Sequence, residues 1–222
     1  MDPITQQQAL AAAGAGGEAG TYVDDLFSTY LYEGTGSNLT ITNGIDLAGE
    51  GGLVWIKNRN TTAYHSLTDT ERGVNKDLIT NGTFTEQDQS SNPSVRQFNS
   101  NGFGIGTEGR VNNSGDPFVS WTFRKAPGFF DVVTWSGNST AGRQIPHSLG
   151  STPGMIIVKR LTSAENWYVY HRSLGATKWI KFSTDQPVST SSMTWNDTEP
   201  TSTHFTVGSD SSVNITGSDY VA

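Results

Sequence analysis

A chain of 222 residues with 14 basic and 21 acidic side chains carries a net charge of −7, which argues against a nucleic-acid groove, because phosphates require clustered Lys and Arg. The absence of cysteine excludes disulfides, thiolate zinc sites and cysteine nucleophiles. No apolar run approaches the roughly 20 residues of a membrane span, and the N-terminus lacks a secretory pattern. Few charged residues (16%), 25 glycines and 10% aromatic residues are typical of strands joined by Gly and Asn turns, so we expect an all-β fold.

Residues 1–37 differ from the rest and are predicted to form an N-terminal segment. Residues 5–13 are a good helix-forming run that ends at a series of glycines. A helix this short is marginal alone in water, so it is either part of a flexible leader or docked onto a partner. Residues 21–33 are rich in aromatic side chains. They predict either a short strand pair or a turn and an extended segment, whose apolar surface must be covered by the following unit or another subunit.

An internal repeat organises the remainder. The run GLVWIK at residues 52–57 returns as GMIIVK at 154–159, an offset of 102 residues. The same offset pairs Leu47 with Leu149 and Phe103 with Phe205, with no insertion or deletion. We therefore predict two tandem copies of one β unit, at residues 38–136 and 137–222. Because the second copy stops in mid-strand, we expect the chain to continue beyond residue 222; the alternative is a strand supplied by a neighbouring subunit.

Apolar alternation and Asn-Gly turns predict short strands throughout both copies. In the first copy the expected strands are residues 39–42, 53–57, 62–68, 77–80, 95–98, 102–106, 118–123 and 129–136. In the second copy they are residues 155–161, 166–171, 178–183, 192–196, 205–207, 213–215 and 219–222. This spacing indicates a β-sandwich or jelly roll in each copy.

No pattern in the sequence points to catalysis, a cofactor or a metal site, and we predict none of them. The histidines lack metal-site spacing and do not recur as a matched set in both copies; they are His65, His147, His171 and His204. We expect His147 to hydrogen-bond between a strand end and the next loop. Carboxylates available for glycoside hydrolysis have no matching pair in the second copy; they are Asp69, Glu71, Glu108, Asp116 and Asp131. Asp24, Asp25 and Asp116 could bind calcium, but no loop has the spacing of a calcium cage.

Three aromatic residues alternate in the second copy and are candidates for a glycan platform: Trp167, Tyr168 and Tyr170. Alternation places Trp167 on one face of a strand and the two tyrosines on the other. A platform would need these rings to be exposed. Packing in the core and between strands is the favoured interpretation, because Trp and Tyr are ordinary strand residues.

A resemblance to known proteins appears at residues 145–159, which read IPHSLGSTPGMIIVK. This segment resembles the signature IPHxLGxxPGMIIVK of bacteriophage virion proteins. The same pattern includes GGLVWIK at residues 51–57, DTERG at 69–73, FNSNGF at 98–103 and YVDDLFSTYLY at 22–32. Most of the chain after about residue 21 is similar to tail fibres and structural proteins of marine and cyanobacterial podophages and siphophages.

The resemblance implies a virion structural protein with lectin-like sandwiches, assembled in the host cytoplasm and located in the phage tail. The expected role is that of a tail-fibre N-terminal region that anchors the fibre, as a homotrimer, to a tail adaptor or nozzle. Alternatives are a capsid decoration or head-fibre protein, and a carbohydrate-binding module that recognises a host surface glycan. The residues expected to dock onto the virion are Ile4, Leu10, Tyr22, Phe27, Tyr30 and Tyr32.

Overall fold

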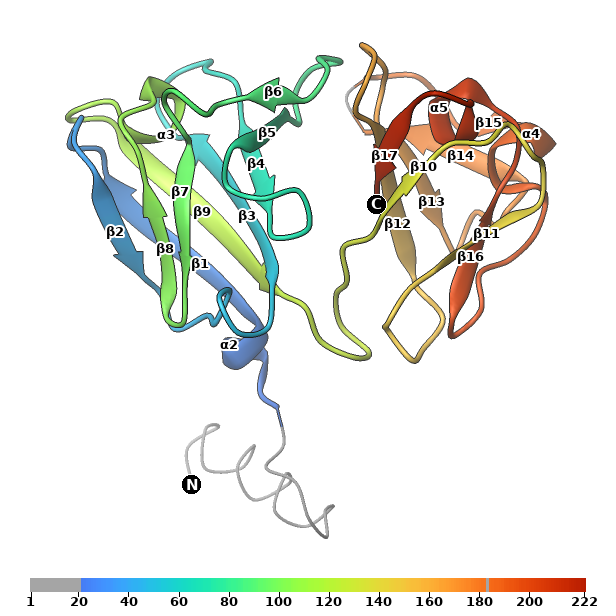
Figure 1. The fold of residues 1–222 in the computed structure, drawn as a ribbon, viewed down its shortest axis with the longest axis horizontal. Coiled ribbons are helices and arrows are strands. Elements are labelled where there is room, and N and C mark those ends of the chain that lie inside the picture. Colours follow the sequence, from blue (N-terminus) through green and yellow to red (C-terminus); the bar gives the residue numbers. More distant parts are fainter. Residues whose placement is uncertain (1–20, 183) are drawn as a thin grey trace, which may run out of the picture.

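The computed structural model describes residues 21–182 and 184–222, which form two β units side by side (Figure 1). The first unit comprises residues 21–124, the connecting segment residues 125–133, and the second unit residues 134–222. The helix predicted at residues 5–13 lies outside the described residues. No helix in the described part of the chain is long and apolar enough to cross a bilayer.

The prediction of an all-β fold is confirmed, since every described helix is a single turn of four residues. The first unit contains α2 (Val23–Leu26), β1 (Phe27–Glu33), β2 (Leu39–Thr42), β3 (Gly52–Asn58), β4 (Ser66–Asp69), β5 (Lys76–Ile79), β6 (Gln87–Asp88), β7 (Val95–Asn99), β8 (Gly102–Ile105), α3 (Gly109–Asn112) and β9 (Pro117–Arg124). The second contains β10 (Thr134–Ser136), β11 (Arg143–Pro146), β12 (Met155–Arg160), β13 (Tyr168–His171), β14 (Lys178–Lys181), β15 (Ser189–Thr190), α4 (Ser192–Trp195), β16 (His204–Val207), α5 (Ser211–Asn214) and β17 (Asp219–Val221).

Each unit packs a six-stranded sheet against a smaller one. The large sheets have the orders β1-β9-β3-β4-β5-β6 and β10-β17-β12-β13-β14-β15, and the small ones are β2-β8-β7 and β11-β16. Alternation along β3 turns Val54 and Ile56 toward Phe103 and Ile105 of the small sheet, where they form the first core. The second core is built the same way, with Val158 of β12 and Phe205 of β16 among its members. The finer assignment to a jelly roll or lectin-like sandwich stays a prediction.

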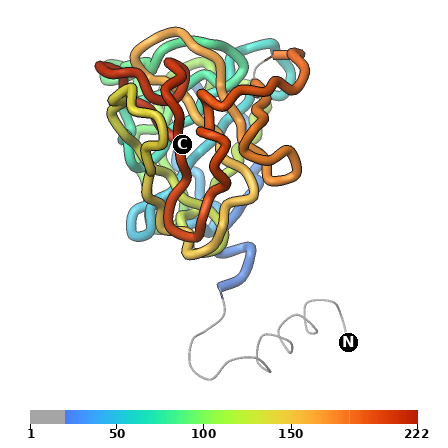
Figure 2. The backbone as a smooth tube through the Cα atoms, turned by 90° about the vertical axis from the view of Figure 1, so that its right-hand side faces the viewer, coloured from blue at the N-terminus to red at the C-terminus, as the bar shows by residue number. Residues whose placement is uncertain are grey.

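The element boundaries follow the 102-residue offset closely. Adding 102 to the bounds of β4, β5, β6, β8 and α3 gives those of β13, β14, β15, β16 and α5. The order of strands in the large sheets corresponds in the same way. Viewed from the second unit, this unit lies in front of the first (Figure 2). The correspondence supports the interpretation of two tandem copies.

The first strands of the units show that two expectations are wrong. Tyr32 of β1 stacks on Phe118, and its hydroxyl donates to the carbonyl oxygen of Val111 at 2.7 Å. Trp135 of β10 stacks on Tyr220, the counterpart of Phe118, and its Nε1 donates to the carbonyl of the counterpart of Val111 at 3.0 Å. The strand containing Tyr32 therefore belongs to the first unit, which begins before residue 38. Its offset is 103 residues, so the repeat is not free of insertions.

Strand β2 shows a further shift. Ile41 of β2 pairs with Phe103, and Ile145 of β11 pairs with Phe205, although Ile41 and Ile145 are 104 residues apart. The two units thus differ in length between their first strand and β3 or β12. From β3 and β12 onward the offset of 102 holds.

Two predicted strands are wrong because side chains cap helical turns there. The expected strand at residues 192–196 is α4, where the Ser191 hydroxyl accepts from the backbone N–H of Met193 at 3.1 Å. The expected strand at residues 213–215 lies mostly in α5, where Asp210 accepts from the N–H of Ser212 at 2.8 Å. Within residues 129–136 only β10 is a strand, and within 62–68 the strand begins at Ser66.

Two buried asparagines at corresponding positions provide a test of this correspondence. Asn112 donates from Nδ2 to the carbonyl of Gly106 at 2.7 Å and accepts from the N–H of Thr35 at 2.8 Å. Asn214 donates to the carbonyl of Gly208 at 2.9 Å and accepts from the N–H of Asn138 at 3.0 Å. Each side chain therefore joins the end of the strand before it, β8 or β16, to the segment that follows the first strand of its unit.

We predict that Asn112→Ala and Asn214→Ala each lower the free energy of unfolding by about 3 kcal/mol, because buried backbone groups lose their partners. The exposed neighbour offers a control, since Asn113→Ala removes one bond to Asp116 and should cost less than about 1 kcal/mol. Urea denaturation measures all three variants. Losses that differ between the first two by more than about 2 kcal/mol would contradict equivalent roles.

Candidate functional site

The outward faces of the two large sheets meet in an apolar cluster, which we call the inter-unit core. Its buried members are Leu67, Leu78, Val132, Trp167 and Val221. Trp167 is 3% exposed, and its Nε1 donates to the carbonyl oxygens of Ile79 and Gly82 at 3.3 and 3.2 Å. An indole that buries its ring and satisfies its N–H across the junction holds the units in one relative position.

A buried lysine lies beside this tryptophan. Lys159 has no exposed surface, and its Nζ donates to the carbonyls of Glu165 at 2.7 Å and Thr83 at 3.4 Å. The ammonium lies 5.9 Å from the centre of the Trp167 ring. Burial lowers the pKa of Lys159 to about 8, because the charged form loses its hydration. The first-unit counterpart, Lys57, is only half-buried.

Backbone bonds reinforce the junction around Lys159. The N–H of Glu86 donates to the carbonyl of Leu161 at 2.9 Å, and the N–H of Glu165 donates to that of Thr83 at 2.8 Å. These bonds join the β5–β6 connection of the first unit to the β12–β13 connection of the second. Because backbone pairing fixes both distance and direction, the junction is a defined interface.

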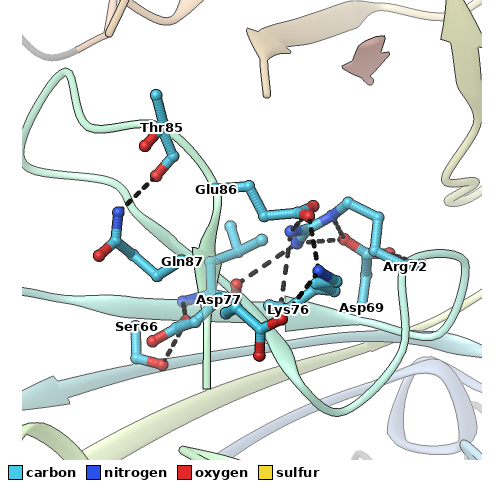
Figure 3. A network of polar contacts seen from close by, with 10 residues as sticks. Ser66, Asp69, Arg72, Lys76, Asp77, Thr85, Glu86 and Gln87 are labelled. Atoms are coloured by element: carbon cyan, nitrogen blue, oxygen red, sulfur yellow. Dashed lines mark hydrogen bonds and ion pairs between the residues drawn. The ribbon is translucent and has the colours of Figure 1, made fainter. Parts of the chain in front are cut away.

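An ion-pair network with a buried centre at Arg72 and Asp69 fixes the first-unit side of this contact (Figure 3). Arg72 bonds to Asp69 at 2.6 Å and to Glu86 at 3.3 Å, and Lys76 lies 3.7 Å from the second oxygen of Glu86. The Arg72 and Asp69 side chains are 4% and 0% exposed. The network therefore holds the loop whose backbone meets Leu161.

The connecting segment is tied to both units. Lys125 bonds to Glu71 at 2.6 Å and to Asp131 at 3.2 Å. The other oxygen of Asp131 accepts from the N–H of Ser148 in the second unit at 2.7 Å. The N–H of Gly128 donates to the carbonyl of Leu149 at 2.7 Å. A segment bonded to both units in this way restricts their movement relative to each other.

An apolar cavity of about 440 Å³ opens between the units, and we call it the inter-unit cavity. Large side chains of both units and of the connecting segment line it, including Trp55, Phe123, Phe129, Phe130, Met155, Ile157 and Phe182. Three of these side chains are exposed, Phe129, Met155 and Phe182. A largely apolar hollow of this size is the default candidate for a binding site.

A few polar groups also reach the inter-unit cavity. Trp55 and His147 line it, and the Nε1 of Trp55 and the Nε2 of His147 are buried without a hydrogen-bond partner in the described part of the chain. As predicted, His147 bonds at a strand end, since its Nδ1 accepts from the N–H of Leu149 at 3.3 Å. A second, polar hollow of about 490 Å³ adjoins the cavity along the connecting segment and shares Asp131 and His147 with it.

The candidate carboxylates of the sequence analysis all have structural partners. Asp69 is paired with Arg72, Glu71 and Asp131 share Lys125, and Glu108 bonds to Arg110 at 3.3 Å. Asp116 accepts from Asn113 and Asn58, and these bonds lower its pKa. Among residues 21–182 and 184–222, no group of three or more His, Asp or Glu side chains could hold a metal ion. The geometry of these carboxylates is therefore that of structural contacts.

The candidate glycan platform is not exposed, and the favoured interpretation of core packing is confirmed. Trp167, Tyr168 and Tyr170 are all less than a tenth exposed. Trp167 belongs to the inter-unit core, while the tyrosines turn to the core of the second unit, with Tyr168 against Trp179 at 4.8 Å. The strand alternation was predicted correctly, but the ring faces are covered.

The expected docking residues fall into three groups. Ile4 and Leu10 lie outside the described residues. Tyr32 packs in the first unit, and Phe27 packs on Phe123 at 4.8 Å, so these two contribute to the fold. Tyr22 and Tyr30 are exposed and remain available to a partner.

The sequence analysis missed both Lys159 and the inter-unit cavity. A lysine at the end of an apolar strand looks like a solvated strand end, and its counterpart Lys57 is only half-buried. Burial of Lys159 depends on the opposite unit, which supplies the carbonyl of Thr83. No signal within a single copy of the repeat could have identified it.

One family model, described as a domain of unknown function, DUF7483, matches residues 23–222 and so spans both units. No curated protein and no solved structure matches the chain.

The buried Lys159 makes stability depend on pH. Its pKa is about 8 when folded and 10.5 when free, so between these values the unfolded chain binds more protons than the folded chain. The free energy of unfolding should therefore rise with pH across this window, as part of a full difference of about 3 kcal/mol. Urea denaturation at a series of pH values from about 7.5 to about 9.5 measures the slope.

Two lysine variants test whether Lys159 is the source of that slope. Lys159→Met should flatten it, and Lys57→Met at the half-buried counterpart should leave it unchanged. An unchanged slope in Lys159→Met would show that another group titrates.

Proposed function

This chain belongs to the DUF7483 family, and we propose that it is a structural protein of a bacteriophage particle, serving as the N-terminal region of a tail fibre. The resemblance of residues 145–159 to a virion signature supports the phage assignment. That segment has a structural role here, because it contains β11's end and most of β12, with Ile156 and Val158 in the second core. A signature that specifies a fold suits a structural protein.

The observation that carries the structural role is the rigid junction between the two units. Trp167, Lys159 and two backbone bonds cross it, and the connecting segment is bonded on both sides. Two β units fixed in this way form a stiff spacer in which each unit contacts its neighbour. A spacer of this kind would hold a distal tip at a fixed position relative to an anchored end.

The anchoring surface we propose lies where residues 1–20 join the first unit. Helix α2 lies at one end of that unit (Figure 1), and its Val23 is 70% exposed, next to Tyr22. On the following strand, Leu31 is 58% exposed beside Tyr30. These four exposed apolar or aromatic side chains, all between residues 22 and 31, suit a contact with a tail adaptor or nozzle.

A capsid decoration protein would use the same rigid body with a different attachment point, so the location in the particle decides between the two. The carbohydrate-binding alternative loses its expected residues, because Trp167, Tyr168 and Tyr170 are covered.

We predict that a cryo-EM reconstruction of particles that incorporate the chain places α2 and β1 against a tail protein, with the second unit pointing outward. A position across the capsomers would replace the fibre assignment with a decoration role. Absence of the chain from purified particles, measured by mass spectrometry, would refute the proposed function altogether.

A variant pair tests the anchoring surface. The double variant Val23→Asp and Leu31→Asp should reduce incorporation into particles by about tenfold or more, because two charges would be buried without partners. Val188→Asp, at an exposed apolar residue of the second unit, is the matched control and should be incorporated normally. Equal incorporation of both variants would exclude this surface as the anchor.

A further inference from the structure

Strand β1 lies at an edge of the large sheet of the first unit. It pairs with β9 along all seven of its residues, and no other strand in the described part of the chain pairs with it. Its sequence, FSTYLYE, contains no proline and no lysine, and its register with β9 runs without a bulge. These are the features that usually protect an edge from pairing, so β1 is an open template for another strand.

The backbone of alternate residues in β1 points away from β9. The N–H of Gly34, just after the strand, donates to the carbonyl of Asp116 at 2.9 Å, so the even-numbered residues of β1 bond to β9. The odd-numbered residues Thr29, Leu31 and Glu33 direct their N–H and C=O groups outward. Among the described residues, these outward groups have no hydrogen-bond partner.

The second unit protects the corresponding edge. Its first strand, β10, has only three residues, and Ser136 is the counterpart of Glu33. The carbonyl oxygen of Ser136 accepts from Nη1 of Arg143 on β11, and a charged side chain at a sheet edge discourages pairing. In the first unit the position of Arg143 is occupied by Leu39, so β1 has no such cover.

A second copy of β1 fits this edge in one register. Antiparallel pairing across a two-fold axis at Leu31 places Leu31 opposite its own copy and Thr29 opposite Glu33 of the second copy. All three outward-facing residues then exchange backbone bonds with the second copy. Moving the axis one residue toward the N-terminus would place Phe27 opposite Glu33, but the N–H of Phe27 already donates to the carbonyl of Val23.

The side chains agree with the same register. Leu31, which is 58% exposed, would contact its own copy on one face of the sheet. On the other face Tyr30, which is 36% exposed, would lie opposite Tyr32 of the second copy. Directly opposed apolar and aromatic pairs stabilise antiparallel strands. Glu33 is the one charged residue of β1 and would face a threonine, so no like charges are opposed.

We propose that β1 is a dimerisation edge, at which a second copy of this chain continues the six-stranded sheet across a two-fold axis. The match of β1 to itself in backbone bonds, side chains and charge favours a second copy over an unrelated strand. Residues 1–20 are poor candidates for a strand along this edge, because Ala and Gly dominate them and both are depleted in strands. The two-fold contact differs from the homotrimer expected from the resemblance.

The proposal goes beyond the anchoring role and does not depend on it. Leu31 belongs to both surfaces, whereas Val23 lies on α2, outside the paired strand. Dimerisation is measured in solution without particles, so a failure of the dimer leaves the anchoring surface to its own test.

Sedimentation velocity of the full chain over a range of concentrations is the first test. We expect dimers, and Leu31→Lys should weaken dimerisation at least about tenfold, because two ammonium groups would meet at the axis. Val188→Lys, at a residue of the second unit that is 47% exposed, is the matched control and should dimerise normally. A monomer at every concentration, a trimer, or a dimer that Leu31→Lys leaves unchanged would overturn the proposal.

The absence of cysteine permits a direct test of the axis. In Leu31→Cys the thiols of the two copies would lie opposite each other, with Cα atoms about 5.5 Å apart, a separation that suits a disulfide. Mild oxidation should therefore link this variant at least about tenfold faster than Glu33→Cys, whose residue on the same strand and face lies opposite Thr29. Equal rates for the two variants would contradict the register.

Hydrogen exchange shows whether another part of the chain covers β1. The outward amides of Thr29, Leu31 and Glu33 should be protected in the dimer and should lose protection on dilution and in Leu31→Lys. Protection that persists in the monomer would mean that the chain covers its own edge, and would also refute the proposal.

Discussion

The structure depends on the need to cover both faces of each large sheet. Strand β3 is apolar on both faces, with Val54 and Ile56 on one and Leu53 and Trp55 on the other. The small sheet of the same unit covers the first face, and in the described part of the chain the second face packs against the second unit. The second unit has the same arrangement, so the two uncovered faces meet and exclude water from each other. Tandem duplication thus gives each unit an apolar outward face and also supplies the neighbouring unit that covers it.

At equivalent positions of the shared fold, the two units have different types of buried side chain. In the first unit, Ser66 donates to the buried Asp77 at 2.7 Å, and Ser94 and Arg110 bond to the same carboxylate. Burial raises the pKa of Asp77 in spite of these bonds. The positions 102 residues after Ser66 and Asp77 hold Tyr168 and Trp179, whose rings pack at 4.8 Å.

This exchange shows that the framework tolerates either solution. A buried charge with several partners and a well-packed aromatic pair can be similar in stability, because the charge gains bonds but loses hydration. The exchange also gives the two units different side chains near their junction. The polar version lies on β4 and β5, beside the Arg72 network that holds the loop meeting the second unit.

Sequence reasoning recovered most strands, since local apolar alternation and Asn-Gly turns specify them. It placed β2 at residues 39–42 and came within one residue of the bounds of β3. It was wrong where one capping side chain determines whether the backbone is a helical turn or a strand, as Ser191 and Asp210 do. It also treated residues 22–32 as a docking segment, although Tyr32 completes the first core, because the shorter spacing of the second copy concealed the matching role of Trp135.

The candidate site was beyond sequence reasoning for a different reason. Burial of Lys159, closure around Trp167 and the inter-unit cavity all arise from the contact of residues far apart along the chain. The alternation that placed Trp167 opposite Tyr168 was sound, but periodicity gives a side chain's face and not what covers that face.

The inter-unit core and the inter-unit cavity share the same residues. Phe130 packs on Phe123 of the first unit while its own connecting segment borders the cavity, and Ile157 belongs both to the partly buried rim of the inter-unit core and to the cavity wall. Apolar surface added inside the cavity would be buried against both units at once. Filling the cavity would therefore tighten the contact between the units, because the same side chains would lose their remaining exposure to water.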